Sequence, residues 1–149
     1  MACAIRMRDV NGQRHNRSAL ILYGSESGIS QDAAEQLGRI LERLRFLTEV
    51  LEMDLIQPVC PPTNKASYGQ YAYSYGLSEL SMYTIVIFTI STTGQGDVPR
   101  NARKFWRSLL RKSLPTDYLS PVNFTTFGFG DSSYIKCVEM WLTAACFIH

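Results

Sequence analysis

Residues 24–30, GSESGIS, form a short Ser- and Gly-rich stretch that could bind an anion. Small side chains let backbone N–H groups approach a phosphate closely, and the N-terminus of a following helix adds a favourable dipole. Gly24 and Gly28 lie too close together for a Walker loop, and no lysine follows Gly28. The stretch therefore indicates a cradle for a stably held monophosphate, although similar turns also precede helices that bind nothing.

Two further Gly-rich turns have residue types suited to a flat redox ring. Residues 91–97, STTGQGD, contain two glycines that allow positive φ angles and a close approach of the backbone to a ligand. Their peptide could present either a carbonyl or an N–H to a ring whose protonation changes on reduction. Residues 128–134, GFGDSSY, end in Tyr134, which could stack on such a ring. The alternatives are a tight turn that caps the next helix and an ordinary surface tyrosine.

Other kinds of site are disfavoured by spacing. Residues 128–134 are not a dinucleotide-binding fingerprint, because Ser133 stands where that motif has its last glycine. The turn also follows the fourth predicted strand, at residues 122–127, whereas the fingerprint follows the first strand. The hydrolase motif G-x-S-x-G is absent, and neither His15 nor His149 has a setting suited to a catalytic triad. The four cysteines form no C-x-x-C pair, which argues against zinc and favours reduced thiols.

Four apolar segments predict the strands that would position these turns. They lie at residues 19–23, 46–53, 83–90 and 122–127. Helices or loops separate them, so we expect a parallel sheet with helices on both faces. Ligands of such sheets bind outside the carboxyl ends of the strands, which is where all three turns lie.

Two helical patterns follow the first and third strands. We expect Ser30 to cap the first helix, and Asp97 or a neighbour to start the second, with Pro99 in its first turn. Apolar residues at helical spacing predict the buried face of each helix. In the first helix they are Ala33, Ala34, Leu37, Ile40, Leu41 and Leu44. In the second they are Ala102, Phe105, Trp106, Leu109 and Leu110.

The second helical pattern also carries basic side chains with no acid among them. They are Arg100, Arg103, Lys104, Arg107, Arg111 and Lys112. Solvation explains most such faces, and docking to an acidic partner is the alternative. Between the second and third strands, residues 58–76 are rich in proline and tyrosine, and we expect an irregular surface loop.

The three turns, taken in order, resemble the three FMN-contacting loops of flavodoxin-like domains. STTGQGDVP followed by NARKFWRSLLRK and NFTTFGFGDSSY is similar to the N-terminal domain of the NADPH-dependent diflavin oxidoreductases. The resemblance implies a doubly wound parallel sheet of order 2-1-3-4-5. It also implies that residues 25–30 hold the FMN phosphate. The implied cofactor-binding residues are Ser25, Glu26, Ser27, Gly28, Ile29, Ser30, Ser91, Thr92, Thr93, Gly94, Phe129, Gly130, Asp131, Ser132, Ser133 and Tyr134.

The resemblance also implies a role in electron transfer. Full-length members pass electrons from NADPH through FAD to FMN, and then to an anamorsin-like iron–sulfur protein of cytosolic cluster assembly. We expect this chain to lack the FAD and NADPH modules and so to be the FMN module, not a complete enzyme. The alternatives are a non-catalytic fragment that acts through partner docking and a stand-alone carrier of the flavodoxin type.

The resemblance runs from about Ser18 to Tyr134, and the larger departure from the family pattern comes after Tyr134. We expect residues 1–17 to be a basic tail, residues 18–134 to be the FMN-binding domain, and residues 135–149 to be an aberrant segment, so that the fifth strand is missing. The net charge of +2 demands neither a nucleic acid nor a membrane as partner. No apolar run reaches the roughly 20 residues that a spanning helix needs, so we expect a cytoplasmic protein.

Overall fold

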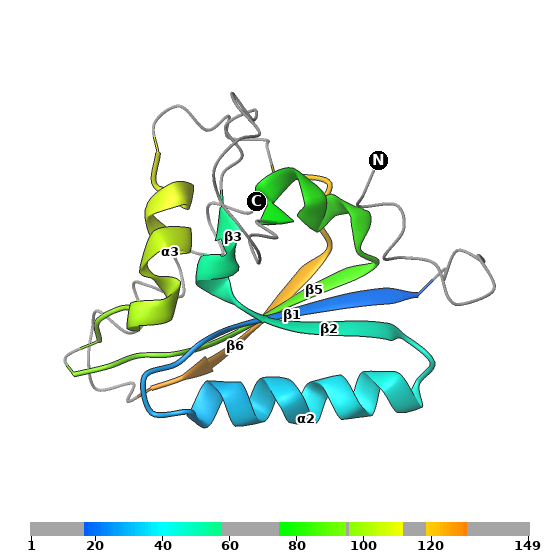
Figure 1. The fold of residues 1–149 in the computed structure, drawn as a ribbon, viewed down its shortest axis with the longest axis horizontal. Coiled ribbons are helices and arrows are strands. Elements are labelled where there is room, and N and C mark those ends of the chain that lie inside the picture. Colours follow the sequence, from blue (N-terminus) through cyan, green and yellow to red (C-terminus); the bar gives the residue numbers. More distant parts are fainter. Residues whose placement is uncertain (1–16, 58–74, 95, 112–118, 131–149) are drawn as a thin grey trace, which may run out of the picture.

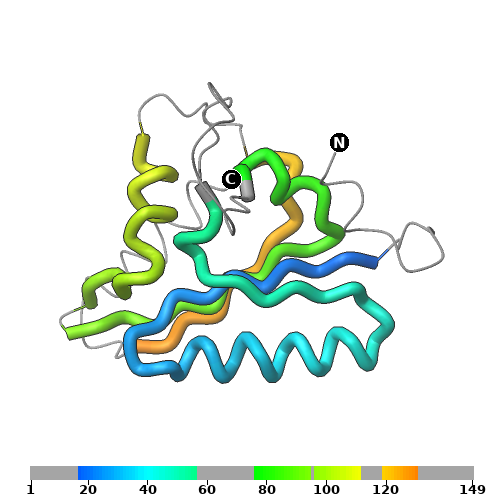
Figure 2. The backbone as a smooth tube through the Cα atoms, viewed as in Figure 1, coloured from blue at the N-terminus to red at the C-terminus, as the bar shows by residue number. Residues whose placement is uncertain are grey.

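The computed structural model describes residues 17–57, 75–94, 96–111 and 119–130 of the 149-residue chain (Figures 1 and 2). Its strands are β1 (Ser18–Gly24), β2 (Leu47–Glu52), β3 (Ile56–Gln57), β4 (Tyr75–Gly76), β5 (Ile85–Ser91) and β6 (Phe124–Phe129). Its helices are α2 (Ile29–Arg43) and α3 (Arg103–Leu109), together with the short 3-10 segments η1 (Met53–Leu55), η2 (Leu77–Met82) and η3 (Arg100–Ala102).

The main sheet has four parallel strands in the order β2-β1-β5-β6. This is the predicted 2-1-3-4 part of the flavodoxin-like order, and the prediction is confirmed. The fifth strand was expected to be missing on the basis of residues 135–149, which lie outside the described part of the chain. β3 and β4 form a separate two-stranded parallel pair.

Strand β1 is apolar throughout because both of its faces are covered. Four consecutive side chains, at positions 19–22, are fully buried, as expected for a central parallel strand. Leu20 and Leu22 pack in the core on the side of α3, whereas Ile21 packs with Ala34 of α2. Figure 1 shows the same division, with α2 along one face of the sheet and α3 and η2 on the other.

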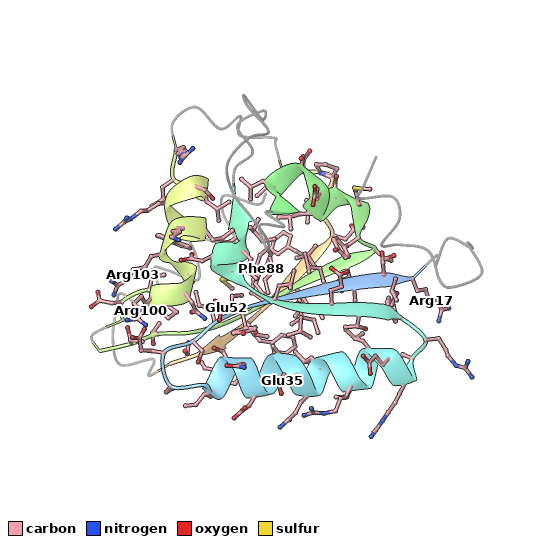
Figure 3. The ribbon with its side chains drawn as sticks, in the orientation of Figure 1. Arg17, Glu35, Glu52, Phe88, Arg100 and Arg103 are labelled. Atoms are coloured by element: carbon pink, nitrogen blue, oxygen red, sulfur yellow. The ribbon has the colours of Figure 1, made fainter. Side chains whose placement is uncertain are left out.

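The core beneath α3 is built around Phe88 of β5. Its ring lies 5.7 Å from that of Phe105 in α3 and 6.2 Å from that of Phe124 in β6. Figure 3 shows Phe88 between the sheet and α3, with Arg100 and Arg103 at one end of the sheet and Arg17 at the other. These aromatic contacts fix α3 over the carboxyl half of the sheet.

The apolar faces of both helices are narrower than predicted. Ile40 and Leu44 of α2 are 50% and 55% exposed, and Leu110 is 46% exposed after the end of α3. Those three assignments to the core are wrong, because Ile40 lies outside the buried stripe of α2, and Leu44 and Leu110 are the C-cap residues that follow α2 and α3. The remaining predicted residues of α3 do pack inward, with Ala102, Phe105 and Leu109 buried and Trp106 against the core.

The helices also begin elsewhere than predicted. Gly28, not Ser30, is the N-cap of α2, and Ser30 lies inside the first turn. The second helix begins not at Asp97 but at η3, for which Pro99 is the N-cap. Thr93 and Asp97 instead form a β-bridge that holds residue 97 in the preceding turn.

Among the described residues, none of the helices combines the length and the hydropathy that crossing a membrane would need.

Candidate functional site

The turn after β1, residues 25–30, is held in shape by its own hydrogen bonds. The Gly28 N–H donates to Ser25 Oγ at 2.8 Å, and the Asp32 N–H makes the first helical bond, to the Gly28 carbonyl, at 2.9 Å. Gly28 has a φ of 91°, a left-handed conformation that suits glycine. The amides at the first turn of α2 precede that first helical bond, so they have no acceptor within the helix and are available to an anion.

Ser30 links this turn to the carboxyl end of β5. Its buried hydroxyl donates to the Gly24 carbonyl at 2.6 Å and lies 3.4 Å from Ser91 Oγ. Ser91 Oγ in turn lies 3.4 Å from the Gly24 carbonyl. The predicted capping role of Ser30 is therefore wrong, and both hydroxyls connect the ends of two neighbouring strands.

The turn after β5 folds back on itself. Thr93 and Asp97 exchange backbone hydrogen bonds of 3.0 and 2.8 Å, and the Gly96 N–H donates to the Thr93 carbonyl at 3.1 Å. Gly94 and Gly96 have φ angles of 52° and 93°, which confirms the positive φ angles predicted here. Gly94 is exposed, so the tip of the turn faces solvent.

The third turn begins beside the second. Ser91 is the register partner of Phe129 at the end of β6, and the Thr92 N–H donates to the Phe129 carbonyl at 2.9 Å. Gly130 follows and is exposed. The predicted site residues Asp131, Ser132, Ser133 and Tyr134 lie outside the described residues. The structure thus brings the other twelve to one edge of the sheet, at the carboxyl ends of β1, β5 and β6.

Two residues of η3 support the first turn, and neither was predicted to contact it. Asn101 Oδ1 accepts a 2.9 Å hydrogen bond from the Ser25 N–H, and the Arg100 N–H donates to Glu26 Oε2 at 3.0 Å. Both contacts join residues more than seventy positions apart. A local spacing pattern cannot indicate a contact between residues so far apart, so these two hydrogen bonds could not be predicted from the sequence.

A cavity of about 580 Å³ lies between the first turn, the end of β2 and the start of α3. Its lining residues are Ser25, Glu26, Gly28, Gln31, Glu52, Asp54, Leu55, Arg100, Asn101 and Lys104. Two of the three carboxylates bind backbone amides of other elements, because Glu26 accepts from Arg100 and Asp54 Oδ1 accepts from Lys104 and Phe105 at 2.8 and 3.1 Å. These acids therefore serve largely as caps for η3 and α3.

The third carboxylate, Glu52, pairs with a tyrosine at the end of β1. The Tyr23 hydroxyl donates to Glu52 Oε1 at 3.4 Å. Burial raises the pKa of the Tyr23 phenol above 10.0, and the negative charges of Glu52 and Glu35 raise it further. The phenol is thus held as a neutral donor.

The described residues of the site are suited to binding an anion and a flat group. In the described ranges, no group of three or more His, Cys, Asp or Glu side chains could hold a metal ion. What the site offers is a glycine-capped helix N-terminus for an anion, beside two turns that expose backbone to a flat group.

Comparison with known proteins points to one family. Residues 21–143 match the profile of the Flavodoxin family. The chain is similar to proteins named NADPH-dependent diflavin oxidoreductase 1. It is 50% identical to that of Emericella nidulans over 120 residues, which cover 80% of this chain and 15% of that protein. It is 40% identical to the Mus musculus protein over 117 residues, which cover 78% and 16%. The chain therefore spans only about a sixth of the length of these relatives.

Solved structures show the same fold. A flavodoxin from Streptococcus pneumoniae aligns with a TM-score of 0.58 at 19% identity, covering 88% of this chain and 74% of that one. Oxidised flavodoxin 2 from Bacillus cereus aligns with a TM-score of 0.58 at 21% identity, with the same coverage of 88% and 74%.

Proposed function

The chain belongs to the flavodoxin family, and from that premise we propose that it is an FMN-binding electron-transfer module. The observation that carries the proposal is the gathering of three turns at one edge of the sheet. The Ser30–Ser91 contact joins the first turn to the second, and the Thr92–Phe129 hydrogen bond joins the second to the third. In doubly wound sheets, ligands bind at this edge.

The residues present fit a ribityl phosphate. A Cβ built on Gly28 would meet nothing within 4 Å, so the cap of α2 opens onto free space. The amides of the first helical turn and the hydroxyls of Ser25 and Ser27 would hold the phosphate there. Glu26, Ile29 and Ser30 complete the proposed phosphate loop.

The other two turns would hold the ring. We assign one edge of it to Ser91, Thr92, Thr93 and Gly94, and the other to residues 129–134. When bound, FMN supplies one-electron redox chemistry, and the protein binds and orients it. The buried hydroxyls of Ser30 and Ser91 are already engaged at Gly24, so they would set the spacing between the phosphate and ring turns.

The first test is reconstitution of the purified 149-residue chain with excess FMN, followed by desalting. We expect about one flavin per chain, with its visible absorbance perturbed by the protein and with free FMN released on denaturation. Riboflavin in place of FMN should bind more weakly because it lacks the phosphate. A colourless protein after reconstitution would overturn the proposal.

The relatives support a more specific role. They are named NADPH-dependent diflavin oxidoreductases, so we propose that the module receives electrons from NADPH through an FAD module. We further propose an anamorsin-like iron–sulfur protein of cytosolic cluster assembly as the acceptor. The test mixes this chain with the Emericella nidulans relative from which the matching N-terminal segment has been removed. NADPH-driven reduction of the iron–sulfur protein should depend on adding this chain, and reduction that proceeds equally without it would refute the role.

A second candidate function is docking without electron transfer. Exposed basic side chains on η3 and α3 favour it, since they form a positive face. These are Arg100, Arg103, Lys104 and Arg107, with Arg111 just beyond the helix end. An acidic protein surface is the partner that such a face attracts. Capture of an acidic partner by the flavin-free chain, lost in an R103E/K104E variant, would support docking, and capture that requires FMN would refute it.

A further inference from the structure

Two hydrogen bonds join η3 to the proposed phosphate loop, one donated by the loop and one donated by η3. At one, the loop donates: the Ser25 N–H binds Asn101 Oδ1 at 2.9 Å. At the other, the loop accepts: Glu26 Oε2 binds the Arg100 N–H at 3.0 Å. Two consecutive loop residues are thus fixed by two consecutive residues of η3.

These two hydrogen bonds can form because the backbones of β1 and η3 approach closely just before the loop. A Cβ added to Gly24, the last residue of β1, would lie only 2.8 Å from the Cβ of Ala102. The glycine therefore lets η3 lie against the strand end, which brings Asn101 within reach of the Ser25 amide. Asn101 is itself half-buried.

The second hydrogen bond explains why a carboxylate occurs in a phosphate loop. A free Glu26 side chain would repel a dianion bound at the neighbouring amides. In the structure the carboxylate is bound to the η3 amide, in the cavity that Arg100 and Lys104 also line. Glu26 therefore anchors the loop, and cationic side chains lie in the same cavity.

From these contacts we infer that Asn101 is a positioning residue that, together with the Glu26–Arg100 hydrogen bond, fixes the loop in its phosphate-accepting form and thereby sets the preference for FMN over riboflavin. The inference rests on the proposed binding of FMN. Because Asn101 occupies the Ser25 amide, it orients the peptides that follow without touching the phosphate. Loss of these hydrogen bonds between η3 and the loop should weaken binding of the phosphate while leaving the ring contacts in place.

The test measures the affinities of the full chain for FMN and for riboflavin by quenching of flavin fluorescence. Asn101→Ala should weaken FMN binding about tenfold, as expected for the loss of one hydrogen bond that holds the loop in place. Riboflavin binding should change less than about twofold, since it makes no phosphate contact. Gln36→Ala, which removes an exposed amide side chain from α2, is the matched control and should alter neither affinity.

A second pair of variants separates positioning from folding. Glu26→Gln keeps an oxygen acceptor for the Arg100 N–H and should retain or exceed the wild-type FMN affinity, whereas Glu26→Ala should lose affinity for FMN selectively. Equal losses for FMN and riboflavin, or an unchanged ratio of the two affinities in both Asn101→Ala and Glu26→Ala, would overturn the inference. If Asn101→Ala does not fold, the two Glu26 variants decide alone. Failure of the wild-type chain to bind either flavin would instead overturn the proposed function.

Discussion

Gly24→Ala tests how closely η3 packs on β1. The new methyl group would lie 2.8 Å from Ala102 Cβ, 3.1 Å from Ile90 Cγ1 and 3.3 Å from Pro99 Cγ. Carbon atoms prefer separations of about 3.5–4.0 Å, so the overlap with Ala102 is about 0.7 Å. All three neighbours are buried, so none of them can move aside into solvent.

The expected loss of stability follows from this overlap. Overpacking a buried position costs about 1–3 kcal/mol, and the stiffer unfolded chain offsets about 0.4–1 kcal/mol of it. We expect a net loss of about 1.5 kcal/mol in the free energy of unfolding. In urea denaturation followed by far-UV circular dichroism, this shifts the midpoint down by about 1 M for an m-value of about 1.5 kcal/mol/M.

A double mutant identifies the cause. Ala102→Gly removes the closest atom, so it should be destabilising alone but should recover about 1 kcal/mol or more when combined with Gly24→Ala. If Gly24→Ala were as stable as wild type, or if the two changes were simply additive, the close packing of η3 on β1 would not limit this position. FMN affinity should fall with Gly24→Ala, because η3 also carries Asn101.

Three further outcomes test other parts of the site. Gly28→Ala should cost about 1–2 kcal/mol of stability from its positive φ alone, since its Cβ would meet no neighbour, and Gly28→Asn should cost less in the same urea assay. Asp54→Ala should cost about 1 kcal/mol because it uncaps the first amides of α3, whereas Asp54→Asn should retain most of the stability. The pKa of Tyr23 is raised in the folded state. Its contribution to folding stability is therefore complete below pH 10.0 and is lost as the pH rises through the pKa of the folded state. Tyr23→Phe should therefore flatten the decline in thermal stability above pH 10.0, and an unchanged decline would contradict the Tyr23–Glu52 interaction.

The strands of the main sheet were predictable because a central parallel strand has a strong signal, whereas their order was expected from the resemblance to flavodoxin-like domains. Residues 19–22 can be buried on both faces only in such a sheet, and the alternation with helices then restricts the topology. The positions of the three turns followed from the ends of those strands. The sequence therefore located the candidate site before any contact was known.

The helix starts were not predictable because hydrogen bonds within the turns outweighed the N-cap propensity of single residues. Serine is a common N-cap, but the Ser30 hydroxyl binds the carbonyl of Gly24, and the cap is a glycine at φ 91°. Asp97 has a typical helix-start residue type, yet its backbone pairs with Thr93. In both turns, hydrogen bonds between residues four to six positions apart replace the helix start that the residue type predicted.

The pairing of β1 has a consequence for synthesis of the chain. The two strands that pair with β1 lie at different distances along the chain. Ser18 pairs with Leu47 of β2, whereas Ala19 pairs with Ile85 of β5. At about 5–20 residues per second, a ribosome takes about 3 to 13 seconds to make the intervening segment. For that time one side of the buried strand β1 has no native neighbour and is open to pairing with other nascent chains.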